Sequence, residues 1–167
     1  MTFPTHTLET APDASRAAMT AVQAKFGGMP LPVAKMATSP HLLNGFLRAS
    51  AAFEQSTLPA LAREVVVMTV AVRNGCQTCV SIHGSTLGRL GRPDLVAPLR
   101  ESADLPDPEL EAVRVFVHRV LDQAGEVSEE ELDGFLAAGY TPANVLEVVF
   151  GIGVYTMSTF ANRLLRA

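Results

Sequence analysis

The chain has 167 residues, of which 48% are hydrophobic and 18% are charged, and its formal net charge is −4. This length suits one domain whose core folds without a metal or a disulfide. The apolar share excludes a disordered chain, and the acidic balance argues against nucleic-acid binding because no basic field is present. The same composition predicts more apolar surface than one core can bury, so we expect a homo-oligomer.

Targeting signals are absent from the pattern of the chain. The first twelve residues are polar and lack the basic flank and apolar run of a secretory signal. The longest apolar stretch, residues 65–72, is far shorter than the ~20 residues of a membrane span. We therefore expect a cytoplasmic protein that does not bind membranes. Two cysteines in that compartment are more typical of catalysis or metal binding than of a structural disulfide.

Helix start and stop signals predict an all-α protein, beginning near the N-terminus. Asp13 can cap a helix over residues 13–26, which a Gly-Gly pair ends. Residues 29–32, Met-Pro-Leu-Pro, are typical of a turn. Ser39 and Pro40 then suit the N-cap and the first position of the next helix.

The second half of the chain repeats these signals. Asp107 and Thr141 are each followed by proline, and Ser128 with Glu131 forms a capping-box pattern. These signals predict three helices, the last of them long. The apolar positions of that last helix trace one face: Leu146, Val149, Phe150, Gly153, Met157, Phe160, Ala161 and Leu164.

Residues 58–73 are ambiguous because their β-branched run also suits a strand. We favour a helix, since Ser56 or Thr57 can cap it and Pro59 lies in its first turn. No other run of the chain alternates cleanly with period two, so a single strand would have no partner.

The stretch after this helix carries the chemistry. Asn74 and Gly75 form a turn signal, so a helix should begin at or near Cys76. Cys76 and Cys79 are close enough there for a disulfide, and a helix start favours a thiolate. His83 follows Cys79 by four residues and shares its face. A Cys-x-x-Cys pair alone is as typical of a partial metal site, or of coincidence, as of a redox pair.

Glu64 adds an acidic residue twelve positions before Cys76. By itself it is typical of a solvated residue in the first turn of a helix. Glu64, the Cys76-x-x-Cys79 pair and His83 together resemble the signature of the AhpD-like family, which includes alkylhydroperoxidases and carboxymuconolactone decarboxylases. The resemblance is strongest over residues 58–90.

The resemblance implies an AhpD-like helical bundle, with residues 1–167 as one domain that forms trimers or hexamers. It implies that Cys79 attacks a hydroperoxide, that Cys76 resolves the product, and that His83 with Glu64 relays protons. The disulfide formed would be reduced by a dithiol donor, a small redox protein or a lipoyl group. Neither haem nor flavin is implied.

Thr78 departs from the family pattern, since many members carry Tyr or His at that position, and this bears on catalytic speed and reductant. The decarboxylase branch typically lacks the cysteine pair, so the pair favours redox chemistry over a decarboxylase-like protein. A zinc site built from the two cysteines, His83 and Glu64 is one alternative. A helical oligomer that uses its cysteines only as a redox switch is the other.

Helix geometry also predicts which of these side chains meet. If two straight helices join at Gly75, Glu64 lies ~16 Å and His83 ~12 Å along the axis from the turn. Glu64 is then better placed to orient or charge His83 than to deprotonate a cysteine. Tyr155 and Asn162 on the last helix can approach the site from a neighbouring element, which the sequence leaves open.

Overall fold

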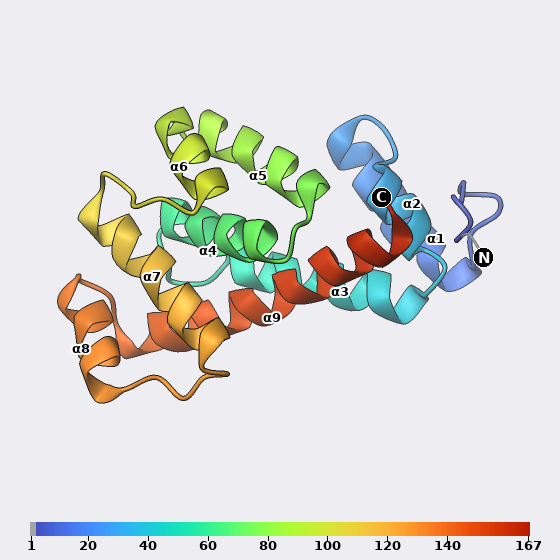
Figure 1. Cartoon of the computed structure of the whole chain (residues 1–167). Coiled ribbons are helices and arrows are strands. Elements are labelled where there is room, and N and C mark those ends of the chain that lie inside the picture. The colour runs from blue at the N-terminus through green and yellow to red at the C-terminus, as the bar shows by residue number, and fades with distance from the viewer. Residues whose placement is uncertain (1–2) are drawn as a thin grey trace.

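A computed structural model describes residues 3–167, and within that range the chain is helical with no strand (Figure 1). The all-α prediction is therefore confirmed. The elements follow in order: α1 (Asp13–Phe26), α2 (Leu31–Met36), α3 (Pro40–Glu54), α4 (Ala60–Arg73), α5 (Gln77–Arg89), the 3-10 helix η1 (Pro93–Leu95), α6 (Val96–Glu101), α7 (Pro108–Asp122), α8 (Glu129–Ala137) and α9 (Pro142–Leu165).

Helix α4 is the central element and packs against α5, α7 and α9 (Figure 1). Every residue from 65 to 71 is buried. Helices cover α4 on several sides, so an apolar, β-branched run is buried there as a helix and not as a strand. The helical prediction for residues 58–73 is confirmed.

The predicted cap of α4 is wrong. Pro59, in an extended conformation, is the N-cap of the helix, and neither Ser56 nor Thr57 caps it. A carboxylate from α9 instead binds the segment just before the helix: Glu147 accepts the backbone N–H groups of Thr57 at 2.8 Å and Leu58 at 3.1 Å. The start of α4 is thus fastened to α9 through a contact that is remote in sequence.

The other predicted caps in the middle and end of the chain are confirmed. Ser39, Asp107, Ser128 and Thr141 each accept a backbone N–H group in the first turn of their helix. The last two also form complete capping boxes. Local side-chain chemistry therefore sets where α3, α7, α8 and α9 begin.

Two predictions near the N-terminus are wrong. Pro12 is the N-cap of α1, and Asp13 is the first helical residue, where its charge still suits the positive end of the helix. Residues 29–32 are more than a turn, since α2 begins at Leu31 with Pro32 in its first turn. Proline is tolerated there because the first N–H groups of a helix need no partner within it.

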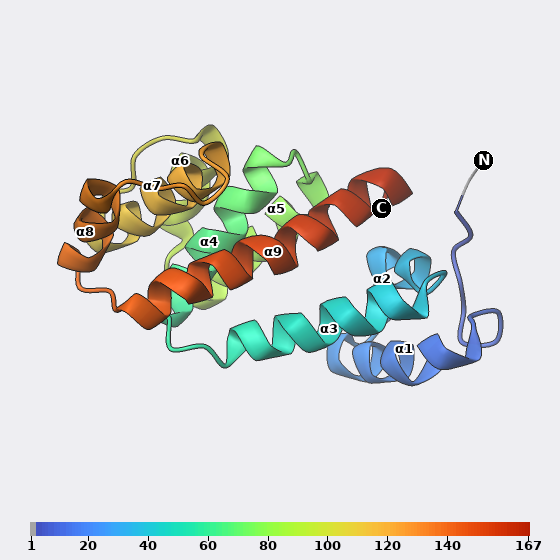
Figure 2. The ribbon, with the colours of Figure 1, turned by 90° about the horizontal axis from the view of Figure 1, so that it is seen from below.

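Helix α9 connects two cores. It contributes Val148 and Ile152 to the main core around α4, and Leu165 to a smaller core with α1, α2 and α3. It runs antiparallel beside α3 (Figure 2). A Cβ at Gly151 would lie 2.6 Å from the ring of Phe53 on α3, so only glycine permits this approach.

The apolar face predicted for α9 is largely exposed. Of its eight positions, only Ala161 is buried, and Met157 is half-buried. By length and composition α9 is the single helix of residues 3–167 that could cross a membrane. However, it packs on α2, α3, α4 and α7, so the fold itself accounts for much of its apolar character.

Candidate active site

The turn between α4 and α5 sets the position of the cysteine pair. Gly75 has a φ of +67°, in the left-handed region that favours glycine. A Cβ there would lie 3.3 Å from Nη1 of Arg163, and this nitrogen donates to the Asn74 carbonyl at 2.7 Å. The turn therefore needs glycine both for its backbone and for the approach of α9.

Cys76 is the N-cap of α5, and Cys79 lies in the first turn. The Cys76 Sγ accepts the backbone N–H of Cys79 at 3.3 Å, in the way a serine or aspartate caps a helix. The two sulfurs form a disulfide, with 5.4 Å between the Cα atoms, and both residues are buried. On reduction, the free N–H groups of the helix start favour a thiolate at this place.

Asn162 of α9 lies beside both sulfurs. Its Nδ2 donates to Cys79 Sγ at 3.3 Å and lies 3.9 Å from Cys76 Sγ. The residue is 5% exposed. The pair thus has a polar side-chain neighbour as well as the helix start.

Glu64 on α4 and His83 on α5 form the second contact of the site. Glu64 Oε2 lies 2.8 Å from His83 Nδ1, and each side chain is 16% exposed. With the proton on Nδ1, the carboxylate orients the ring and leaves the Nε2 lone pair available as a base. The expected proximity of Glu64 to His83 is present. Within residues 3–167, no hydrogen bond joins either group to a sulfur.

Tyr155 of α9 forms a wall beside His83. The rings meet edge to face, with centroids 5.3 Å apart, and the Tyr155 hydroxyl lies 3.3 Å from Ser50 Oγ. Burial raises the pKa of Tyr155; the Ser50 hydrogen bond opposes this, and the charge of nearby Glu64 adds to it. The phenol is therefore neutral at physiological pH and serves to pack and orient the imidazole.

The end of the chain also holds the cysteine segment in place. Asn74 Nδ2 donates to Thr159 Oγ1 at 2.9 Å, just before the first cysteine. Thr78, between the cysteines, donates its hydroxyl to the carbonyl of Ala167 at 2.7 Å. The residue that departs from the family pattern thus has an anchoring contact in this chain.

The structure brings together all four side chains that the sequence singled out, as two pairs: the disulfide and the Glu64–His83 contact. It adds Tyr155 and Asn162, which the sequence left open. The one sequence feature that could have identified Asn162 as a site residue is its amide on a mostly apolar helix. This feature is weak, because asparagine is more often on the surface.

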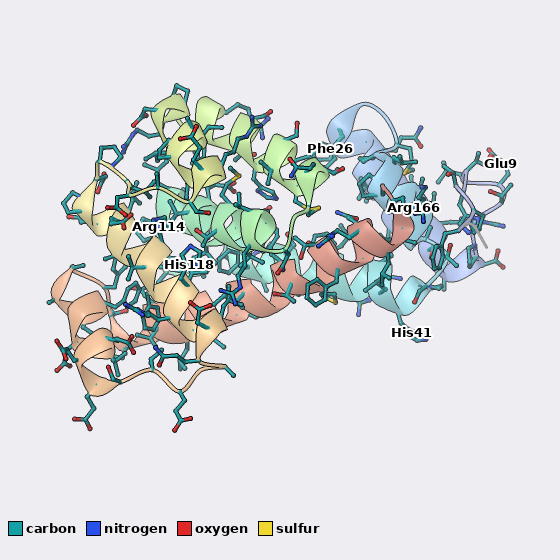
Figure 3. All side chains as sticks on the ribbon, in the orientation of Figure 1. Glu9, Phe26, His41, Arg114, His118 and Arg166 are labelled. Carbon is teal, nitrogen blue, oxygen red and sulfur yellow. A yellow bond between two sulfur atoms is a disulfide. The ribbon has the colours of Figure 1, made fainter. Side chains whose placement is uncertain are left out.

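The three other histidines lie elsewhere. His118 is on α7, His41 is near the start of α3 (Figure 3), and His6 precedes α1. Burial lowers the pKa of His118, and the charge of Arg114 adds to this effect. No cluster of three or more metal-ligating side chains occurs in residues 3–167.

The sequence matches no family model and no curated protein. Solved structures do resemble it. A peroxidase-related protein from Ralstonia eutropha, with an alkylhydroperoxidase AhpD core, aligns at a TM-score of 0.85 and 23% identity, over 97% of this chain and 88% of that chain. A peroxidase-related protein from Silicibacter sp. aligns at 0.81 and 20% identity, over 99% and 88% of the two chains.

A third similar structure is a cysteine-to-alanine variant of the debrominase Bmp8 in complex with 2,3,4-tribromopyrrole. It aligns at a TM-score of 0.74 and 14% identity, over 93% of this chain and 84% of that chain. These likenesses extend over nearly the whole chain, so the protein has the all-α AhpD-like fold. At these sequence identities the likenesses define the fold only, and the activity has to be inferred from the residues of the site.

Proposed function

We propose that the protein is a thiol-dependent peroxidase that reduces hydroperoxides through Cys76 and Cys79. The observation that carries the proposal is the cysteine pair at the start of α5, joined as a disulfide, with the Glu64–His83 pair on the same two helices. The names of two structural neighbours, both peroxidase-related, support the same class of enzyme.

The first step oxidises Cys79. Its thiolate attacks the distal oxygen of the hydroperoxide, the O–O bond breaks, and the sulfur becomes a sulfenic acid. His83, oriented by Glu64, accepts the thiol proton, directly or through water, and returns a proton to the departing alkoxide, which leaves as an alcohol.

The second step closes the disulfide, and a third step reopens it. The Cys76 thiol attacks the sulfenic sulfur, and water leaves as the S–S bond forms. A dithiol donor then transfers two electrons and two protons to the pair and becomes a disulfide itself. A small redox protein or a lipoyl group in the cytoplasm suits this role, and the cycle uses neither haem nor flavin.

The decisive experiment counts thiols while following peroxide. Reduced protein given one equivalent of cumene hydroperoxide should lose both thiols together and release one equivalent of alcohol. Excess dithiothreitol should then support many turnovers. If both cysteines remain alkylatable after peroxide, the proposal is wrong. If the disulfide forms once but excess dithiol supports no turnover, the pair is a redox switch.

A homo-oligomer, a trimer or a hexamer, is the assembly that we propose. The observation in its favour is the exposed apolar face of α9, whose members are Leu146, Val149, Phe150, Gly153, Phe160 and Leu164. Contiguous apolar faces of this kind are typical of protein interfaces.

A further inference from the structure

The amide of Asn162 is only half satisfied. Its Nδ2 donates to Cys79 Sγ at 3.3 Å, whereas its Oδ1 is buried and has no hydrogen-bond partner within residues 3–167. Buried side-chain acceptors almost always have a partner, so the state shown, with the cysteines oxidised, is an unfavourable one for this amide.

Reduction of the disulfide changes the acceptor of the Asn162 Nδ2–H group. A disulfide sulfur is a weak acceptor and carries no proton. Addition of two electrons and two protons breaks the S–S bond and yields two thiols, one of which can ionise. A thiolate accepts the Nδ2–H group in a charge-assisted hydrogen bond, which is stronger than a hydrogen bond to a neutral disulfide sulfur. This change stabilises the reduced pair.

Residues that precede and follow Asn162 in α9 fix the position of its amide. Arg163, the next residue, donates to the Asn74 carbonyl, and Thr159, one turn earlier, accepts from the Asn74 side chain. The turn before Cys76 is thereby tied to the same stretch of α9 that carries Asn162. The hydrogen bond to Cys79 is consequently preorganised, and the amide need not move when the pair changes its redox state.

We propose that Asn162 is a positioning residue that stabilises the reduced cysteine pair relative to the disulfide and makes Cys79 the more reactive sulfur. The preference for Cys79 follows from the two distances, 3.3 Å against 3.9 Å to Cys76. Stabilising the reduced form makes a disulfide a better oxidant and easier for a donor dithiol to reduce. This inference rests on the proposed function only in requiring that the pair cycles between dithiol and disulfide.

The test is the equilibrium of the pair with dithiothreitol in wild type, Asn162→Leu and Asn162→Ala. The first variant keeps the branched shape of the side chain and the second avoids overpacking, so either folded variant decides. Loss of a hydrogen bond to a charged group should shift the equilibrium constant roughly tenfold to a hundredfold toward the disulfide. At 29.6 mV for each tenfold change, the potential becomes about 30 to 60 mV more negative.

A second readout isolates Cys79. In a Cys76→Ser background, Asn162→Ala should slow the reaction of Cys79 with iodoacetamide at pH 7 by about tenfold, because the thiolate loses its donor. The matched control is Ser158→Ala, a buried residue on the same helix whose hydroxyl bonds only to the Tyr155 carbonyl. It should leave the equilibrium constant and the alkylation rate unchanged.

The outcomes separate the two proposals. If the wild-type pair cycles and the folded Asn162 variants keep its equilibrium constant within about twofold, the inference is overturned and the proposed function stands. If the wild-type pair forms no disulfide at any dithiothreitol ratio, both are overturned. A loss of thermal stability with unchanged redox values would show that Asn162 has only a structural role.

Discussion

The Glu64 carboxylate on α4 lies 2.8 Å from the His83 imidazole on α5. The two helices meet at the Gly75 turn, and the contact lies well away from that turn along both of them. The Glu64–His83 pair is therefore set back from the start of α5, where the cysteines are. In the proposed mechanism, Glu64 therefore acts on the cysteines through His83.

Glu64→Gln should slow the oxidation of Cys79 by peroxide about 10²–10⁴-fold, the usual contribution of general acid–base catalysis. The amide cannot stabilise the imidazolium that forms when His83 accepts a proton. Stopped-flow oxidation of the reduced protein measures the rate, and Glu101→Gln, an exposed residue of α6, is the control. Equal rates in wild type and Glu64→Gln would assign Glu64 a structural role only.

The two cysteines should respond differently to substitution. Cys79→Ser should abolish the reaction with peroxide, because it removes the attacking sulfur. Cys76→Ser should keep the reaction and leave a sulfenic acid at Cys79 that dimedone traps, since no second thiol can condense with it. Mass spectrometry detects the adduct. An adduct at Cys76 in the Cys79→Ser variant would reverse the two roles without changing the chemistry.

Gly75→Ala should destabilise the protein by about 1–2 kcal/mol or more, because an alanine at φ +67° is strained and its Cβ meets Arg163. Gly88→Ala is the control within α5. Gly88 is exposed, and an added Cβ there meets nothing within 4 Å, so alanine should stabilise the helix by up to ~1 kcal/mol. Urea unfolding of both variants gives the two values. Equal effects would show that the turn tolerates a side chain.

Much of the fold follows from local signals, and the rest depends on packing between distant segments. The caps at Ser39, Asp107, Ser128 and Thr141 are predictable because each involves a side chain and a backbone group within one turn. By contrast, Glu147 binds the segment just before α4 from 89 or 90 residues away, so no local pattern reveals this contact.

The site divides in the same way. Cys76, Cys79 and His83 all belong to α5 or its N-cap, and Glu64 lies on the preceding helix, so spacing alone predicts the two pairs. Asn162 is 83 residues from Cys79, and its contact depends on how α9 crosses α5. The apolar pattern of α9 identifies a helix but leaves open which side the core covers. The side with the larger apolar residues is in fact exposed.

The Glu147 carboxylate gives a test of stability against pH. Burial acts to raise its pKa, but the N–H groups of Thr57 and Leu58 and the amide of Asn144 outweigh this, and the pKa is lowered. A carboxyl group with a lowered pKa stabilises the fold above its unfolded pKa of about 4.3 and loses that contribution as pH falls through the folded value.

Glu147→Gln should therefore lower the free energy of unfolding by about 1–2 kcal/mol at pH 7. The difference from wild type should shrink as pH falls below the unfolded pKa of about 4.3, because protonation removes the charge that the N–H groups stabilise. Denaturant unfolding at pH 7, 5 and 3.5 measures it. A difference that stays constant with pH would show that the charge of Glu147 does not hold α4 to α9.

The exposed face of α9 gives the last prediction, on assembly. Light scattering should find a multiple of the 17.8 kDa chain mass, a trimer or a hexamer, at micromolar concentration. Phe160→Glu places a charge on this face, and burying a charge without a partner is costly, so the mass should fall toward that of the monomer. Phe26→Glu, at the exposed end of α1 (Figure 3), is the control and should keep the wild-type mass. A monomeric wild-type protein would contradict the assembly, and an oligomer that Phe160→Glu leaves intact would place its contacts on another face.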